Sequence, residues 1–189
     1  MTLEFYDSDP EAYSRKTFDA DMSGLRAHFT CRLSPGSRIL DLGCGSGRDS
    51  LAFMRMGYDV VPADGSEGMC RVAESNIGIP VRRMLFSEMD YADEFDGVWA
   101  CASLLHACSA DLPSIFAAVH RALRRDGVFF CCFKYGDFEG VRDGRHYTDM
   151  TESSLGNLLE SSGFRTEEIW TSDNGGFHWV NAVSTRIGQ

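Results

Sequence analysis

Short apolar segments alternate with helical segments along most of the 189-residue chain. The apolar segments carry hydrophobic residues at successive positions, which predicts strands that are buried on both faces. Strands are predicted at 37–42, 58–64, 81–85, 95–102 and 128–133. Because parallel strands need crossover connections, this alternation predicts a parallel sheet with helices on both sides.

Apolar residues at helical spacing and capping residues mark the helices. A stripe of apolar residues predicts one helix over 18–33, before the first strand. Similar patterns predict helices over 48–57 and 67–76. Asp111 is an N-cap candidate for the helix after the fourth strand, and Thr151 opens the last helix.

The pattern changes near the C-terminal end of the chain. Residues 165–171 and 177–183 have the composition of two further strands, and the segment 173–176 between them, DNGG, is typical of a hairpin turn. We therefore expect an α/β fold with a seven-stranded, mostly parallel sheet whose last strand is antiparallel.

The length favours a single domain over 1–189, since about 100–200 residues per domain is usual. We expect an N-terminal helical cap over 1–33 and a ligand-binding core over 37–133. Residues 134–150 show no strong periodicity and are predicted to form a loop on the substrate side, because long loops in compact domains are usually functional. A helix and a hairpin over 151–189 complete the domain.

Acidic residues outnumber basic residues by 28 to 18, which gives a formal net charge of −10. A chain with this balance lacks the clustered Lys and Arg that bind nucleic-acid backbones or anionic membranes. No apolar run has the length of a membrane span, and the acidic N-terminus is unlike a signal peptide. We expect neither nucleic acid nor membrane as a partner; the oligomeric state is left open.

The seven cysteines are scattered and include no Cys-x-x-Cys pair. This spacing indicates neither a zinc site nor a dithiol redox motif, so no bound metal is expected. Free thiols in a globular chain are typical of the cytoplasm, where disulfides rarely persist.

The segment DLGCGSG, residues 41–47, joins the first strand to the next helix. Glycines there permit a tight turn and close approach of a ligand to the helix N-terminus. Asp64 ends the second strand, where a carboxylate can accept hydrogen bonds from ribose hydroxyls. A dinucleotide fingerprint would need a glycine in place of Arg48, and Asp41 would repel a pyrophosphate but attract a sulfonium or an amino group. The alternative is a tight turn that binds no ligand.

Four segments, in this order, resemble the class I S-adenosylmethionine-dependent methyltransferases: ILDLGCGSGRDS, VVPADGSEGM, FDGVWACASLLH and LRRDGVFFCCFKYG. The resemblance extends over essentially the whole chain and is greatest to the small bacterial tellurite-resistance-type methyltransferases. It implies a Rossmann-like three-layer sandwich. It also implies transfer of a methyl group from S-adenosyl-L-methionine to a small-molecule nucleophile by in-line displacement, with S-adenosyl-L-homocysteine as the product.

The resemblance also implies which positions bind the cofactor. Asp41 and the glycine loop would hold the methionine part, and Asp64 would hold the ribose. Met69 and Phe86 would flank the adenine. The implied positions are Tyr13, Thr17, Asp41, Gly43, Cys44, Gly45, Asp64, Gly65, Met69, Phe86 and Cys101.

Candidate catalytic residues follow the fourth and fifth strands, because ligands of open α/β sheets bind beyond the carboxyl ends of the strands. Together with Arg142, two of them would form a cationic cluster that recruits an anionic substrate. His106, Lys134 and Arg142 are equally well explained as structural or solvated groups. The candidates are His106, Lys134, Arg145 and His146.

Two other functions stay open at this point. A nicotinamide-dependent oxidoreductase uses a similar fold, although the glycine pattern argues against it. A non-catalytic S-adenosylmethionine-binding protein would keep the cofactor pocket without turnover.

Overall fold

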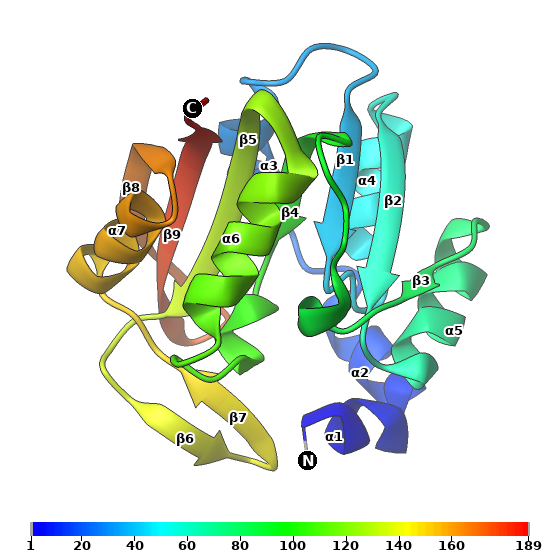
Figure 1. Cartoon of the computed structure of the whole chain (residues 1–189). Helices are drawn as coiled ribbons and strands as arrows, with labels where there is room; N and C mark the ends of the chain where they lie inside the picture. Colours follow the sequence, from blue (N-terminus) through cyan, green and yellow to red (C-terminus); the bar gives the residue numbers. More distant parts are fainter. Residues whose placement is uncertain (1, 189) are drawn as a thin grey trace.

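The computed structural model describes residues 2–188. In this part of the chain the main sheet has seven strands in the order β3-β2-β1-β4-β5-β9-β8, and β9 runs antiparallel to both of its neighbours (Figure 1). The predicted seven-stranded, mostly parallel sheet is therefore confirmed. Its strands are β1 (Arg38–Leu42), β2 (Asp59–Asp64), β3 (Arg82–Arg83), β4 (Phe95–Ala100), β5 (Leu123–Lys134), β8 (Phe164–Asn174) and β9 (Phe177–Arg186).

Helices cover both faces of this sheet and make the three-layer sandwich (Figure 1). One layer contains α3 (Ser23–Thr30), α4 (Arg48–Arg55) and α5 (Glu67–Ile77). The other layer contains α6 (Leu112–Ala122) and α7 (Glu152–Ser161). None of the helices in the described residues has the length and apolar character needed to cross a bilayer.

Successive apolar residues of the central strands fill the core on both sides, because alternate side chains point to opposite faces. On one face the Trp99 ring stacks on Phe130 at 4.0 Å and packs against Phe29 of α3. On the other face Phe129 packs edge-on against Phe116 of α6. All five rings are fully buried.

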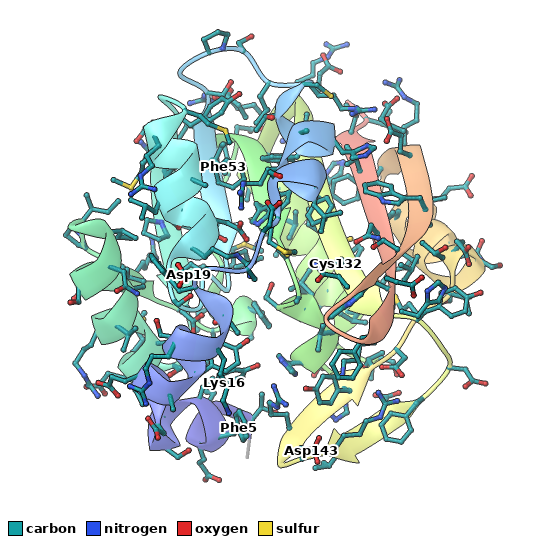
Figure 2. The ribbon with its side chains drawn as sticks, turned by 180° about the vertical axis from the view of Figure 1, so that it is seen from behind. Phe5, Lys16, Asp19, Phe53, Cys132 and Asp143 are labelled. Carbon is teal, nitrogen blue, oxygen red and sulfur yellow. The ribbon has the colours of Figure 1, made fainter. Side chains whose placement is uncertain are left out.

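Two N-terminal helices and a small hairpin lie at the edge of the sheet where the parallel strands end (Figure 1). Phe5 of the first helix faces the tip of the hairpin near Asp143 (Figure 2). These elements therefore flank the edge at which a ligand of an open α/β sheet binds. They are α1 (Thr2–Ser8), α2 (Pro10–Thr17), β6 (Glu139–Arg142) and β7 (Arg145–Thr148).

The prediction of one continuous helix over 18–33 is wrong. The chain leaves helical geometry after α2 and re-enters it only at Ser23. The carboxylate of Asp21 accepts a hydrogen bond from the Ser23 backbone N–H at 2.8 Å, which gives the backbone an alternative to the helical pattern. The third strand is also shorter than predicted, because only Arg82 and Arg83 pair with β2.

Residues 134–150 do not form the expected irregular loop, because β6 and β7 pair within them as an antiparallel hairpin. Arg142 pairs with Arg145 across a two-residue turn, Asp143-Gly144, in which both φ angles are positive, 48° and 77°. This is the geometry of a type I′ turn, for which Asp-Gly is a strong sequence signal. The signal was present in the sequence and was missed.

Candidate cofactor and substrate site

A cavity of about 480 Å³ lies at the carboxyl ends of β1, β2 and β4, beneath α1 and α2. The strand order reverses at β1, because the chain goes from β1 outward to β2 and β3 and then returns to β4 on the other side. Such a switch point opens a crevice between the loops that leave the two central strands. The cavity occupies this crevice.

The glycine loop after β1 forms one wall of the cavity. Gly43 has φ +79°, and a Cβ placed there would lie 2.3 Å from the Ser103 Cβ, so this glycine allows two loops to pack together. Gly45 has φ +56°, and a Cβ there would meet no atom within 4 Å. The Gly45 backbone therefore borders open space and can be approached closely by a ligand.

Asp64 stands at the end of β2 and holds the glycine loop from the side. Its carboxylate accepts hydrogen bonds from the backbone N–H groups of Gly45 and Ser66, both at 2.9 Å. Burial raises the pKa of Asp64 above its ordinary value. The side chain is thus fixed by main-chain donors at the cavity wall, and a carboxylate with two oxygens retains acceptor capacity for hydroxyl groups.

Asp41 lies deeper, at the end of β1, and is buried. The hydroxyl of Ser50 donates to its carboxylate at 2.6 Å. Burial and the nearby Asp49 carboxylate raise the pKa of Asp41 to about 7. This end of the cavity therefore contains a carboxylate that lacks a direct cationic partner among the described residues and that would be stabilised by a cationic ligand.

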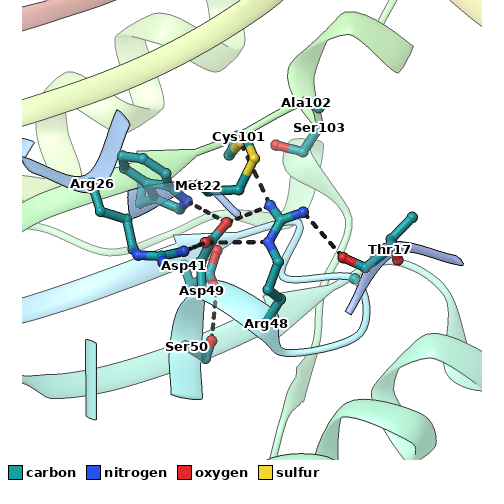
Figure 3. A network of polar contacts seen from close by, with 12 residues as sticks. Thr17, Met22, Arg26, Asp41, Arg48, Asp49, Ser50, Cys101, Ala102 and Ser103 are labelled. Carbon is teal, nitrogen blue, oxygen red and sulfur yellow. Dashed lines mark hydrogen bonds and ion pairs between the residues drawn. The ribbon is translucent and has the colours of Figure 1, made fainter. Parts of the chain in front are cut away.

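The first turn of α4 carries a buried polar network beside Asp41 (Figure 3). The carboxylate of Asp49 accepts hydrogen bonds from Arg26, Arg48 and the indole N–H of Trp99. Arg48 also points to the Thr17 carbonyl at 3.4 Å and the Cys101 sulfur at 3.8 Å. The network holds one cationic group, the Arg48 guanidinium, against the cavity wall.

The far side of the cavity is apolar. Met69 of α5 and the segment from Met84 to Phe86 line this part, and the helix N-terminus is capped by Ser66, whose hydroxyl accepts from the Met69 N–H at 3.0 Å. A Cβ on Gly65 would lie 3.2 Å from the side chains of both Leu3 and Leu85, so the slot is narrow. Its shape and polarity suit a flat heterocycle.

His106, after β4, lies at the other end of the cavity with its ring orientation defined by two hydrogen bonds. Its Nδ1 donates to the His146 carbonyl at 2.7 Å, so in the neutral ring Nε2 is the acceptor. The Tyr6 hydroxyl donates to Nε2 at 2.7 Å. Burial lowers the pKa of His106 to about 4, with a smaller contribution from the positive charge of Arg145. The ring is therefore neutral at pH 7.

The cavity brings together all of the residues that the resemblance implied for cofactor binding, together with His106. It is not lined by Lys134, Arg145 or His146. Lys134 lies over the rings of Tyr147 and Phe177, at 4.5 and 3.7 Å from their centroids. Arg145 and His146 contact the site indirectly, through Tyr6 and His106 respectively.

Several residues at the site were missed by the sequence interpretation. Tyr6 and Leu3 line the cavity from α1, which had been assigned only to a helical cap. Arg48 had been used only as an argument against a dinucleotide. Ser103 gives no sequence signal, because its role as the neighbour of Gly43 depends on the meeting of two loops.

The cofactor that the sequence implied fits these residues. Gly45 leaves room for close approach, and Asp64 retains acceptor capacity for a ribose. Asp41 offers negative charge to an ammonium or a sulfonium, and Arg48 offers positive charge to a carboxylate. A nucleoside with a zwitterionic amino acid and a sulfonium has all of these groups, so the fold and the site together fit a class I S-adenosylmethionine-dependent methyltransferase.

Comparisons with known proteins agree with this class. A family model described as a methyltransferase domain matches residues 39–127. An uncharacterized methyltransferase of Synechocystis is 27% identical over 147 residues, which cover 70% of this chain and 68% of that protein. A ubiquinone biosynthesis O-methyltransferase of a Ruegeria species is 36% identical over 102 residues, covering 51% of this chain and 40% of that one.

Solved structures give the same result. The 1,6-didemethyltoxoflavin-N1-methyltransferase of Burkholderia thailandensis, with 1,6-didemethyltoxoflavin and S-adenosylhomocysteine bound, has a TM-score of 0.81 and 25% identity, covering 98% of this chain and 86% of that chain. A TehB-like methyltransferase of Corynebacterium glutamicum has a TM-score of 0.74 at 21% identity, covering 95% and 98%. The family model and these structures support a class I S-adenosylmethionine-dependent methyltransferase, and they do not favour an oxidoreductase or a non-catalytic binding protein.

Proposed function

We propose that this enzyme methylates a small molecule that carries both an acidic nucleophilic atom and a separate anionic group. We further propose that it works as a single domain over 1–189, in the cytoplasm and without a nucleic-acid partner; the free thiols of its cysteines and the net charge of −10 support this. The observation that carries the substrate proposal is the neutral His106 beside the unpaired cation Arg145.

The cofactor supplies an activated methyl group, so the protein mainly has to align the acceptor and exclude water. Tyr6 and Tyr13 close the cavity from the N-terminal helices. Their rings meet edge to face with centroids 5.0 Å apart, which makes a continuous aromatic cover over the site. We assign the cover to the exclusion of water and the alignment of the acceptor.

His106 is proposed as the group that accepts the proton of the nucleophile. Its Nε2 lone pair already accepts the Tyr6 hydroxyl, so the nucleophile would give its proton to the Tyr6 oxygen while the Tyr6 proton moves to Nε2. A pKa of about 4 makes the ring a weak base, so the acceptor atom should itself be acidic, as in a phenol or a heteroaromatic N–H.

Arg145 does not line the cavity but contacts Tyr6, which does, and we expect its positive charge to favour an anionic group on the substrate. No carboxylate of the described residues forms an ion pair with Arg145, and its Nε is buried without a hydrogen-bond partner. Its guanidinium lies instead over the rings of Phe5, Tyr6 and Tyr147. Arg142, by contrast, is paired with Asp149 and is removed from the expected cationic cluster. An anion beside Arg145 would also raise the pKa of His106, because Arg145 contributes to lowering it.

Methyl-transfer assays on matched acceptor pairs test this function. Each pair consists of a phenol or heteroaromatic N–H compound with a carboxylate and the same compound with a neutral amide. We expect turnover of at least one carboxylate compound, with a lower kcat/KM for its amide. Arg145→Gln should reduce this preference, while Arg71→Gln, an exposed arginine paired with Glu67 outside the cavity, should not. Equal rates for acid and amide in the unaltered enzyme would contradict the anionic substrate.

A further inference from the structure

We propose that Cys108, Glu139 and His146 bind a divalent metal ion of the zinc type at the outer edge of the cavity. The sulfur, one carboxylate oxygen and one imidazole nitrogen of these residues all lie within 4.8 Å of one another. The residues come from the segment after β4 and from the two strands of the β6–β7 hairpin. The inference does not depend on which acceptor the enzyme methylates.

The separations are close to those of a zinc site. Bond lengths of 2.0–2.3 Å in a tetrahedral ion place its ligand atoms roughly 3.3–3.7 Å apart. The Glu139 oxygen and the His146 nitrogen are already 3.6 Å apart. Cys108 is exposed, and a change of its side-chain rotamer can bring the sulfur closer to the other two ligand atoms.

Glu139 is held in position and kept charged by its surroundings. The hydroxyl and the backbone N–H of Ser109 donate to its two oxygens at 2.6 and 2.8 Å, and these hydrogen bonds lower the pKa of Glu139. Each carboxylate oxygen has a second lone pair, so a ligand atom remains for a cation. Ser109 thus already ties the Cys108 segment to β6.

His146 can supply a neutral nitrogen. Its Nε2 lies 3.2 Å from the Thr148 hydroxyl, which itself donates to the Ala107 carbonyl and so accepts from His146. Metal binding at Nε2 would shift the ring proton to Nδ1 and replace the bond to Thr148. With the Cys108 thiolate and the Glu139 carboxylate, the ligands balance the two charges of the ion, and the thiol proton is released to solvent.

The proposed position has a chemical consequence. Three protein ligands leave one coordination position of a tetrahedral ion for water or a substrate atom, as in catalytic zinc sites. Cys108 also lines the cavity, and the carbonyl of His146 orients His106. A metal here would therefore join the hairpin to the cavity edge, close to the proposed proton acceptor.

Metal binding can be measured on the full chain without cofactor or acceptor. After treatment with a chelator, zinc is titrated by calorimetry and cobalt by absorption, since thiolate ligation gives a sulfur-to-cobalt charge-transfer band and tetrahedral geometry gives strong d–d bands. We expect one ion per chain and at least tenfold weaker binding in Cys108→Ser and in His146→Ala. Matched controls are Cys31→Ser and His178→Ala, which alter exposed residues outside the cluster.

Thermal unfolding without metal verifies that the variants fold. Cobalt binding without a thiolate band would overturn the proposal, as would binding that is equally strong in Cys108→Ser and the control variants. An affinity weaker than about 100 µM would also overturn it. None of these outcomes bears on methyl transfer, so failure of the metal site is distinct from failure of the proposed function.

Discussion

The Tyr6 hydroxyl donates to His106 Nε2 at 2.7 Å and thereby connects the first helix of the chain to the loop after β4. The two residues are 100 positions apart in sequence, and both line the cavity. Because Nδ1 of the same ring donates to the His146 carbonyl, the imidazole is held from both sides. The covering helix, the proposed proton acceptor and the hairpin thus form one connected unit.

Replacing Tyr6 with phenylalanine should reduce turnover more than it reduces stability. Tyr6→Phe keeps the aromatic cover but leaves Nε2 of His106 without its donor, which costs about 1 kcal/mol of stability. We expect kcat to fall roughly tenfold, while binding of S-adenosylhomocysteine stays within about threefold. Steady-state kinetics and calorimetry measure both quantities. Tyr58→Phe, outside the cavity, is the control; an unchanged kcat in Tyr6→Phe would remove this hydroxyl from the proposed mechanism.

The Asp41→Asn variant should be more stable than the parent protein without cofactor, and the gain should grow with pH. The pKa of Asp41 is about 7 in the folded chain, above its unfolded value of about 3.9, so the native state binds the extra proton between these pH values. The parent protein therefore loses stability as pH rises through 7, by up to about 1.4 kcal/mol per pH unit. The variant carries no such group.

Thermal unfolding of both proteins at pH 5 and pH 8 measures this difference. We expect the variant to exceed the parent in Tm by more at pH 8 than at pH 5. The same variant should bind S-adenosylhomocysteine about tenfold more weakly, because the amino group loses a charged partner. A gain in stability that is equal at both pH values would show that Asp41 is not the titrating group.

Asp64→Asn should weaken binding of S-adenosylhomocysteine by roughly 10–100-fold, since hydrogen bonds to a charged group contribute about 1.5–3 kcal/mol. Asp7→Asn is a matched control. The Asp7 carboxylate also accepts from Ser66 and from a backbone N–H, that of Gly68, but it does not line the cavity. Calorimetry should give near-parental affinity for the control; equal losses in both variants would indicate that Asp64 acts only by supporting the loop.

Gly43→Ala should be strongly destabilising. The new Cβ would lie 2.3 Å from Ser103 Cβ at a positive φ, which adds overpacking to backbone strain, together about 2–4 kcal/mol. Gly57→Ala has a similar φ of +88° but meets no atom within 4 Å, so we expect only about 1 kcal/mol there. Urea denaturation measures both. Ser103→Gly in the Gly43→Ala background should recover part of the loss, and the absence of any recovery would contradict the proposed clash.

The order of strands and helices could be predicted from sequence because each strand pattern is local. The buried strands β4 and β5 contain apolar runs, at 97–100 and 128–133, and capping residues such as Ser66 and Thr151 act within one turn of their helices. Two predictions failed because a local feature interrupted the pattern. Asp21 interrupts the helix that was predicted over 18–33, and Asp143-Gly144 forms a hairpin turn within the loop that was predicted over 134–150.

The cofactor end of the site was predictable for a related reason. Asp41 and Asp64 lie at the ends of two adjacent strands, and the glycine loop follows the first of these strands. Strand pairing in a parallel sheet therefore brings them close together. The motif spacing alone therefore predicted which residues line this end of the cavity.

The substrate end was decided by the tertiary structure. Tyr6, His106 and His146 come from a helix, a loop and a hairpin, and no local pattern indicates that they meet. Packing also separated the cationic residues, because Asp149 pairs with Arg142 while Arg145 stays among aromatic rings. Local spacing determined the fold and the glycine loop. Contacts between distant segments determined the position of Arg145, the neutral state of His106 and the aromatic cover of Tyr6 and Tyr13 at the place where the acceptor would bind.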